Sequence, residues 1–169
     1  MKSYLFSTMV MSIMLVMAAC NSEGDELVDY SEDVIDPMNE MRADMEDLSD
    51  ELMTMQDEQE IYDTFNNEIL PQVEDMEQFM QEYDEEELEY EETQELHQLH
   101  AETIETMHEG IQLMVEALEL FLQGDVVNAD PLMDEALQYI EEGESLQEGF
   151  DDRIDELGEE YDLEIEEAE

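Results

Sequence analysis

Positive charge is almost missing from this sequence. Three Lys and Arg residues stand against 54 Asp and Glu residues among 169, which gives a formal net charge of −51 at pH 7. A chain with a field of this sign and size repels nucleic acid, anionic lipid and anionic wall polymers. We therefore expect no binding to nucleic acid. The charge favours cations, basic peptides or basic proteins as partners.

Cysteine occurs once, at Cys20, and tryptophan is absent. One cysteine cannot form a disulfide within the chain, and a free thiol is a liability in an exported protein. The residues before it run from Lys2 through a mainly apolar stretch to Ala18 and Ala19, which is the order of a secretory signal peptide. The apolar stretch is shorter than the about 20 residues that a membrane-spanning helix needs.

The segment Met17-Ala18-Ala19-Cys20 resembles the lipobox of bacterial lipoproteins. That resemblance implies cleavage before Cys20 by signal peptidase II and a diacylglyceryl group on its sulfur. Two or three acyl chains hold a protein at a membrane, whereas one short chain binds only marginally. We therefore expect residues 1–19 to be a lipoprotein signal peptide and the protein to lie on the extracytoplasmic face of the bacterial cell membrane. The alternative is an ordinary secreted protein that is cut after Ala19.

The excess of carboxylates strains a compact chain through self-repulsion. Salt weakens this repulsion, since the Debye length falls from about 10 Å at 0.1 M to about 3 Å at 1 M. The composition is therefore typical of a protein that works at high salt or alkaline pH, and a cation-binding surface is the alternative. Apolar residues still make up 42% of the chain, so we expect one folded domain and not a disordered acidic tail.

Proline and glycine are scarce, with three and six residues, and no stretch alternates as a strand does. Residues 21–36 show no clear apolar stripe, so we expect residues 20–36 to be the lipidated cysteine and an acidic tether. Asp36 followed by Pro37 is typical of a helix start, with Asp36 as the N-cap. We expect a helical bundle over residues 37–161 and an acidic tail over 162–169.

The fold that this pattern predicts is all-α, an elongated antiparallel three-helix bundle. The first helix covers 37–83 and is long and kinked or broken, because its apolar phase shifts near residues 56–60 and Pro71 interrupts it. A turn at 84–88 separates it from the second helix.

The second helix carries two adjoining apolar stripes, which is typical of a helix packed between two neighbours. We expect it to end near Gln123, with Gly124 at the C-terminal cap. The third helix is expected to follow at once, capped by Asp125, with Asp130 before Pro131 as the alternative start.

All three histidines lie within residues 95–110. His97 and His100 are spaced i, i+3 and could share one metal ion with a Glu from a neighbouring helix. Glu105 and His108 form a Glu-x-x-His pair, which di-iron bundles use twice and which occurs here once. The alternative places His97 and His100 in the core with hydrogen bonds to carboxylates. No cofactor is expected, and a divalent cation remains the open alternative.

No pattern of catalytic residues stands out. Cys20 is committed to the anchor, and carboxylates are too abundant for one pair to indicate acid–base catalysis. The sequence has no glycine-rich phosphate loop, no His-Glu-x-x-His motif and no EF-hand spacing. We therefore expect a non-enzyme, a binding or spacer module of the cell envelope. The alternative is a protein that binds calcium or magnesium on acidic faces, or zinc or copper through His97 and His100.

Residues 62–163 resemble small uncharacterised helical lipoproteins of Bacillus-type bacteria. The resemblance lies in ELHQLHAE, then EGIQLMVEALEL, a short turn, and a closing helix near EEYDLEI. It implies a helical bundle tethered to the outer face of the membrane. One related group carries the label cell-wall-binding lipoprotein, and such proteins are richer in lysine than this chain.

Overall fold

The computed structural model describes residues 11–13, 22–83, 88–161 and 165–167, which form an all-α protein with one short strand pair. The first helical run is made of α1 (Ser22–Tyr30), η1 (Ser31–Ile35) and α2 (Asp36–Leu52). The second run is made of α3 (Glu58–Thr64), η2 (Phe65–Ile69) and α4 (Leu70–Glu82). Two long helices follow, α5 (Glu91–Leu122) and α6 (Val126–Glu160).

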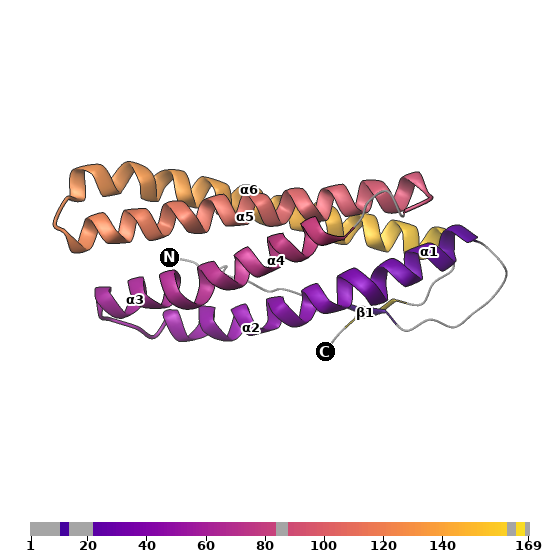
Figure 1. The fold of residues 1–169 in the computed structure, drawn as a ribbon, viewed down its shortest axis with the longest axis horizontal. Coiled ribbons are helices and arrows are strands. Elements are labelled where there is room, and N and C mark those ends of the chain that lie inside the picture. The colour runs from indigo at the N-terminus through magenta and orange to yellow at the C-terminus, as the bar shows by residue number, and fades with distance from the viewer. Residues whose placement is uncertain (1–10, 14–21, 84–87, 162–164, 168–169) are drawn as a thin grey trace.

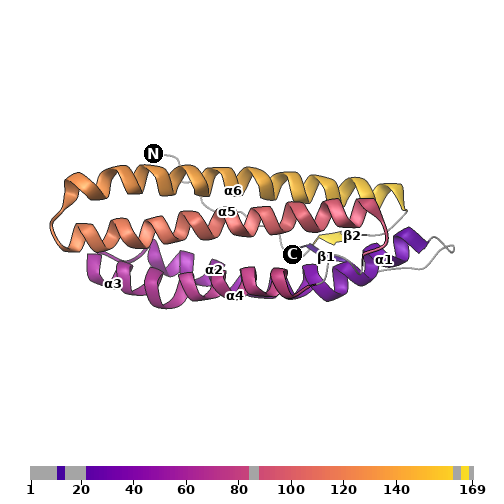
Figure 2. The ribbon, with the colours of Figure 1, turned by 45° about the horizontal axis from the view of Figure 1, so that its top comes forward.

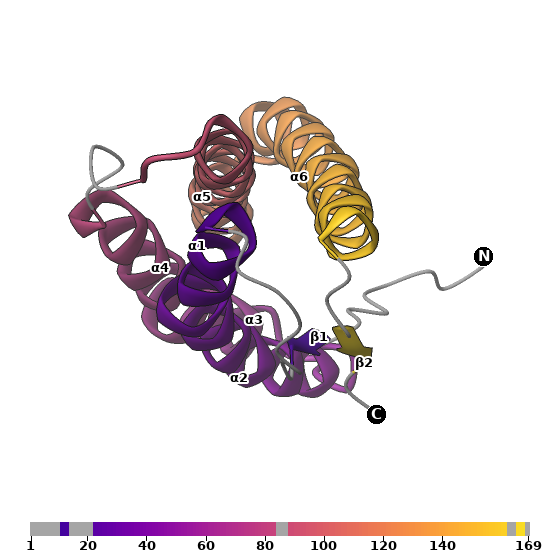
Figure 3. The same ribbon diagram turned by 90° about the vertical axis from the view of Figure 1, so that its right-hand side faces the viewer.

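The four runs alternate in direction along one long axis (Figure 1). The turns at 53–57 and 123–125 lie at one end of the molecule, which we call the turn end. Ser22 and the start of α5 lie at the other, which we call the Ser22 end. Seen from two further directions, α5 and α6 form one pair above the first two runs (Figures 2 and 3).

The expected three-helix arrangement is therefore wrong, because the chain reverses at residues 53–57 instead of continuing. Asp57 caps α3, since its side chain accepts hydrogen bonds from the N–H groups of Gln59 at 3.0 Å and Glu60 at 3.1 Å. The shift of apolar phase in this region marks the end of one helix and the start of an antiparallel one. The turn predicted at 84–88 falls mostly outside the described residues.

Each of the two π-helical segments lies just before a proline, η1 before Pro37 and η2 before Pro71. Proline lacks an N–H, and its ring clashes with the carbonyl four positions earlier in a regular α-helix. Ahead of Pro37, the N–H of Asp36 reaches back five residues to the carbonyl of Ser31. This wider turn carries the helix through the proline. Asp36 is consequently not an N-cap, and the expected helix start at this point is wrong.

The acidic tether expected over 20–36 is also wrong from Ser22 onward. These residues are helical, and Leu27, Tyr30 and Val34 are buried with 4%, 0% and 0% of their surface exposed. They step by three and four residues and continue to Met38, so they form one apolar stripe. The bundle therefore begins at Ser22 and not at residue 37.

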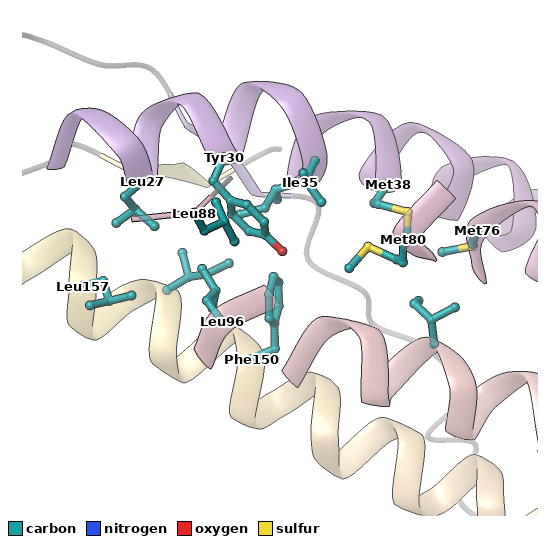
Figure 4. Packing of buried hydrophobic residues seen from close by; sticks show 13 residues of the cluster. Leu27, Tyr30, Ile35, Met38, Met76, Met80, Leu88, Leu96, Phe150 and Leu157 are labelled. Atoms are coloured by element: carbon teal, nitrogen blue, oxygen red, sulfur yellow. The ribbon is translucent and has the colours of Figure 1, made fainter. Parts of the chain in front are cut away.

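The main core lies toward the Ser22 end and draws on every helical run. Figure 4 shows Tyr30, Leu96 and Phe150 converging from three different elements. Burial of each such large side chain contributes about 1.5–3 kcal/mol to stability. The buried cluster consists of Leu27, Tyr30, Val34, Ile35, Met38, Met76, Met80, Leu88, Leu96, Ile104, Phe150, Ile154 and Leu157.

The helices α5 and α6 agree closely with the prediction. Gly124 has φ +80°, the left-handed conformation expected of a glycine after a helix. The helix α6 begins at Val126 with Pro131 inside it, so the later start after Asp130 is not used. Asp125 precedes the helix but gives no side-chain cap; its carboxylate accepts from the amide Nδ2 of Asn128 at 2.8 Å.

Small residues let α5 and α6 approach closely. A Cβ built on Gly110 would lie 3.1 Å from the Cβ of Tyr139, and one on Gly143 would lie 2.8 Å from Cγ of Met107. Ala117, Ala129 and Ala136 are fully buried. Close approach of this kind fixes the register of the pair, since larger side chains would push the helices apart.

A short antiparallel ladder joins β1 (Met11–Ile13) to β2 (Ile165–Glu167), with Met11 opposite Glu167. The rest of the predicted signal peptide 1–19, Cys20 and most of the predicted tail 162–169 lie outside the described residues. Cleavage before Cys20 would remove β1. Among the helices that the structure describes, none has the length and apolar content to cross a membrane.

Candidate functional site

His97 lies in the bundle interior, on the face of α5 that meets α1 and the end of α4. Its Nδ1 is 3.4 Å from the hydroxyl of Tyr30, and its ring centroid is 5.5 Å from that of Tyr83. Tyr30 meets both of these rings edge-on at 5.9 Å. Burial raises the pKa of Tyr30 well above its ordinary value, so the phenol stays protonated. His97 is thus part of an aromatic cluster.

His100 lies one turn further along α5, with 1% of its surface exposed. It stacks on Phe150 of α6, with ring centroids 4.4 Å apart and planes tilted by 30°. Within the part of the chain that the structure describes, neither ring nitrogen has a hydrogen-bond partner. Burial, with smaller contributions from Arg42 and His97, lowers the pKa of His100 to about 3. The imidazole is therefore neutral across the physiological pH range.

Arg42 joins α2 to α6 beside this layer. Its Nη2 donates to Oε1 of Gln147 at 2.7 Å, and Nε2 of Gln147 donates to Oδ1 of Asp151 at 2.8 Å. Burial raises the pKa of Asp151, while the bond from Gln147 and the charge of Arg42 act against that rise. A fixed positive charge beside His100 also opposes the binding of a cation there.

The Glu-x-x-His pair does not join this layer. His108 Nδ1 contacts Oε2 of Glu77 on α4, and its Nε2 lies 2.7 Å from the amide Nε2 of Gln112. Glu105 is exposed on the outside of α5. The four candidate ligands therefore point to different surroundings. Among the described residues, no group of three or more His, Cys, Asp or Glu side chains is placed to hold a metal ion.

The alternative interpretation of the histidines is right about position and wrong about His100's neighbour. His97 and His100 are both buried, with 5% and 1% exposed. His100 packs on an aromatic ring and not on a carboxylate. The spacing on α5 places these rings in the core, but the neighbours that face them come from residues 30 and 150, which no local pattern links to them.

Sequence reasoning missed an acidic cleft of about 550 Å³ at the turn end. It forms where the end of α2 meets the start of α3, and Asp57 at its rim is already engaged in capping α3. The step of three residues from Asp57 to Glu60 and Asp63 is the signal that could have indicated it. The cleft is lined by Glu51, Met55, Asp57, Gln59, Glu60, Asp63, Thr64 and Glu68.

The Ser22 end is held together by polar contacts. The carboxylate of Glu26 accepts hydrogen bonds from the N–H groups of Glu89 at 2.7 Å and Tyr90 at 3.1 Å. The hydroxyl of Tyr90 donates to Oγ of Ser22 at 2.6 Å. In the sequence, Cys20 precedes Ser22 by two residues.

Comparison with known proteins adds no relative. No family model, no curated protein and no solved structure matches this chain.

Proposed function

We propose that this protein is a non-catalytic lipoprotein, held on the extracytoplasmic face of the bacterial cell membrane by acylated Cys20. The observation that carries the proposal is the start of the bundle at Ser22, two residues after Cys20. The helix α1 is packed into the core and tied to the start of α5. Acyl chains on Cys20 would therefore hold the folded bundle directly at the bilayer.

The shape and charge of the molecule suit a binding or spacer module that projects from the membrane. The helix α5 has 32 residues, which corresponds to about 48 Å at 1.5 Å per residue. A surface with a formal net charge of −51 is repelled by anionic lipids. Attachment at the Ser22 end then places the turn end away from the bilayer.

The resemblance to helical lipoproteins of Bacillus-type bacteria supports the same location. The negative charge of this chain repels anionic wall polymers and attracts a basic protein or peptide, so we propose a basic partner. The interior also supports a non-catalytic role, because His97 and His100 are used in core packing and lie among aromatic rings.

Fractionation of cells that express the full chain tests the anchor. The parent protein is expected in the membrane fraction, and a Cys20→Ala variant in the medium or the soluble fraction. A Ser22→Ala variant is the matched control, because it changes the adjacent bundle start and leaves the thiol in place. Membrane retention of the Cys20→Ala variant to the same extent as the parent would refute the anchor.

Capture of divalent cations is the second candidate function, and the acidic cleft at the turn end favours it. Five carboxylates line this cleft, which suits weak and salt-sensitive association with calcium or magnesium. The version with zinc or copper at His97 and His100 has less support, because Arg42 stands beside His100. Zinc titration of the parent and of a His97→Ala, His100→Ala double variant shows whether the histidines or the carboxylates bind the cation. Equal binding would eliminate the histidine version.

A further inference from the structure

We propose that the turn end is a docking surface for a positively charged amphipathic segment of another protein. The inference deepens the proposed binding role, and only the orientation of the surface depends on the anchor at Cys20. Three independent features of the turn end support it: exposed apolar side chains, thin internal packing and a rim of one charge sign.

Exposed apolar side chains gather at the two turns. Among the described residues, the exposed large hydrophobics are Met53 at 50%, Val126 at 46%, Val127 at 84% and Leu137 at 48%. Met53 and the two valines are more than 70 positions apart in the sequence, yet the antiparallel fold brings both turns to the same end (Figure 1). Single exposed apolar residues are common, whereas three at one end of so polar a chain need an explanation.

Internal packing explains why apolar surface is left over at this end. The large buried cluster includes Leu27 and Leu157, which lie toward the Ser22 end of their helical runs, and Leu88 just before α5. Figure 4 shows its packing. Toward the turn end, the buried apolar residues of α5 and α6 are Met114, Val115, Ala117, Ala129 and Ala136, so three of these five side chains are small. Leu120, Phe121 and Leu122 in the last turn of α5 stay only half-buried. The bundle itself therefore leaves part of its apolar surface uncovered here.

Among the residues that the structure describes, the charged side chains around these positions are all acidic. The acidic cleft begins beside Met53, and Glu119, Asp125 and Asp130 flank the turn between α5 and α6. Arg42 is engaged with Gln147 inside the bundle, and Arg153 pairs with Glu95 and Glu156. A second copy of the chain would be repelled by its equal charge. A segment with lysine or arginine on one face and apolar residues on the other complements both features.

Calorimetric titration of the full chain, purified in mild detergent, tests the surface with two synthetic peptides. One is an amphipathic peptide of lysine and leucine, and the other keeps the lysines and replaces each leucine with serine. We expect the leucine peptide to bind at least about tenfold more tightly, because apolar contact adds to charge.

In a Val126→Ser, Val127→Ser double variant, we expect the affinity for the leucine peptide to fall about tenfold, so that the preference over the serine peptide is lost. Leu137→Ser is the control, since Leu137 is as exposed as Val126 but lies about three turns along α6 from the two valines, and it should bind as the parent does. Circular dichroism confirms that each variant keeps its helix content.

Three results would overturn the proposal: equal affinity for both peptides, equal losses in both variants, or a dimer that the valine substitutions dissociate. Cell fractionation does not enter this test, so failure of the anchor and failure of the docking surface remain distinguishable.

Discussion

At the scale of single residues, the most unusual side chain is His100. Its neutral imidazole stacks on Phe150, and neither ring nitrogen has a hydrogen-bond partner among the described residues. An unsatisfied buried polar group costs about 1–3 kcal/mol. Replacing it with an apolar residue of similar size removes that cost. The imidazole therefore makes folding sensitive to acid without adding much stability at neutral pH.

A His100→Leu substitution should remove part of the acid sensitivity of folding. The pKa of His100 is about 3 in the folded protein and 6.5 in the unfolded chain. The folded protein favours the neutral imidazole. The unfolding free energy is therefore unaffected by this group above pH 6.5, and it decreases as the pH falls from 6.5 toward 3. At about pH 5 the parent should have lost about 2 kcal/mol through this residue, and the variant none.

Urea unfolding of both proteins at about pH 7 and pH 5 measures the difference. The groups that face His100 are Arg42 and His97, with Asp151 connected through Gln147. Burial raises the pKa of Asp151, Asp36 and Glu144, which acts in the opposite direction as the pH falls. These carboxyl groups are present in both proteins, so their effects largely cancel in the difference between the unfolding free energies of parent and variant. Parallel pH profiles for parent and variant would contradict the account.

The two arginines should differ in their effect on stability. Arg42→Met removes the donor to Gln147 and leaves a buried amide oxygen unpaired, so we expect a loss of about 1–3 kcal/mol. Arg153→Met removes the same charge from the surface, and we expect a change within about 0.5 kcal/mol. Thermal unfolding of both variants gives the comparison. Equal losses would mean that charge, and not the Arg42 bond, matters.

At the scale of elements, the first helical run shows where sequence reasoning failed. The stripe formed by Leu27, Tyr30 and Val34 is present in the sequence, but acidic residues separate its members and Asp36-Pro37 is typical of a helix start. The π-helical turn before Pro37 allowed the helix to continue. Local rules indicated a boundary, and burial against α5 and α6 overrode it.

Truncation of Tyr30 tests whether residues 22–36 belong to the fold. Tyr30 is fully buried in the main cluster, so Tyr30→Ala should cost about 3–5 kcal/mol of unfolding free energy. Asp29→Ala changes the exposed neighbour and should cost little. Urea denaturation of the two variants provides the measurement. A tether would tolerate both changes equally.

The close pairing of α5 and α6 gives a second test at this scale. A larger side chain at Gly110 meets Cβ of Tyr139 and the carbonyl oxygen of Ala136, so Gly110→Leu should destabilise by about 1–3 kcal/mol or more. Gly149 has open space around it, and Gly149→Ala should stabilise α6 by up to about 1 kcal/mol. Melting temperatures that move in the same direction would contradict this packing.

At the scale of the whole molecule, sequence reasoning recovered the all-α class and both long helices. The strict spacing from His97 to Phe121 and the glycine at position 124 made those boundaries plain. The sequence predicted three helical runs where the structure has four, because the reversal of the chain at 53–57 contains no glycine or proline. The burial of His97 followed from its stripe. The partners of His100 and the acidic cleft depend on contacts between helices, which no single helix records.

Salt should stabilise the whole bundle. The formal net charge of −51 repels itself over distances that about 1 M NaCl screens to about 3 Å. Helix content by circular dichroism and the urea midpoint should therefore rise as NaCl increases from low ionic strength. Micromolar calcium or zinc should not substitute for molar salt. A full gain of structure at micromolar divalent ion would place cation capture ahead of the spacer role.

The measurement that tests the central claim most directly is the intact mass of the protein extracted from membranes of its host. The account predicts a chain that begins at Cys20 and carries the added mass of a diacylglyceryl group, with or without a further acyl chain. The orientation of the bundle at the bilayer depends on that modification. A chain that begins elsewhere, or one that begins at Cys20 with an unmodified thiol, would contradict the account.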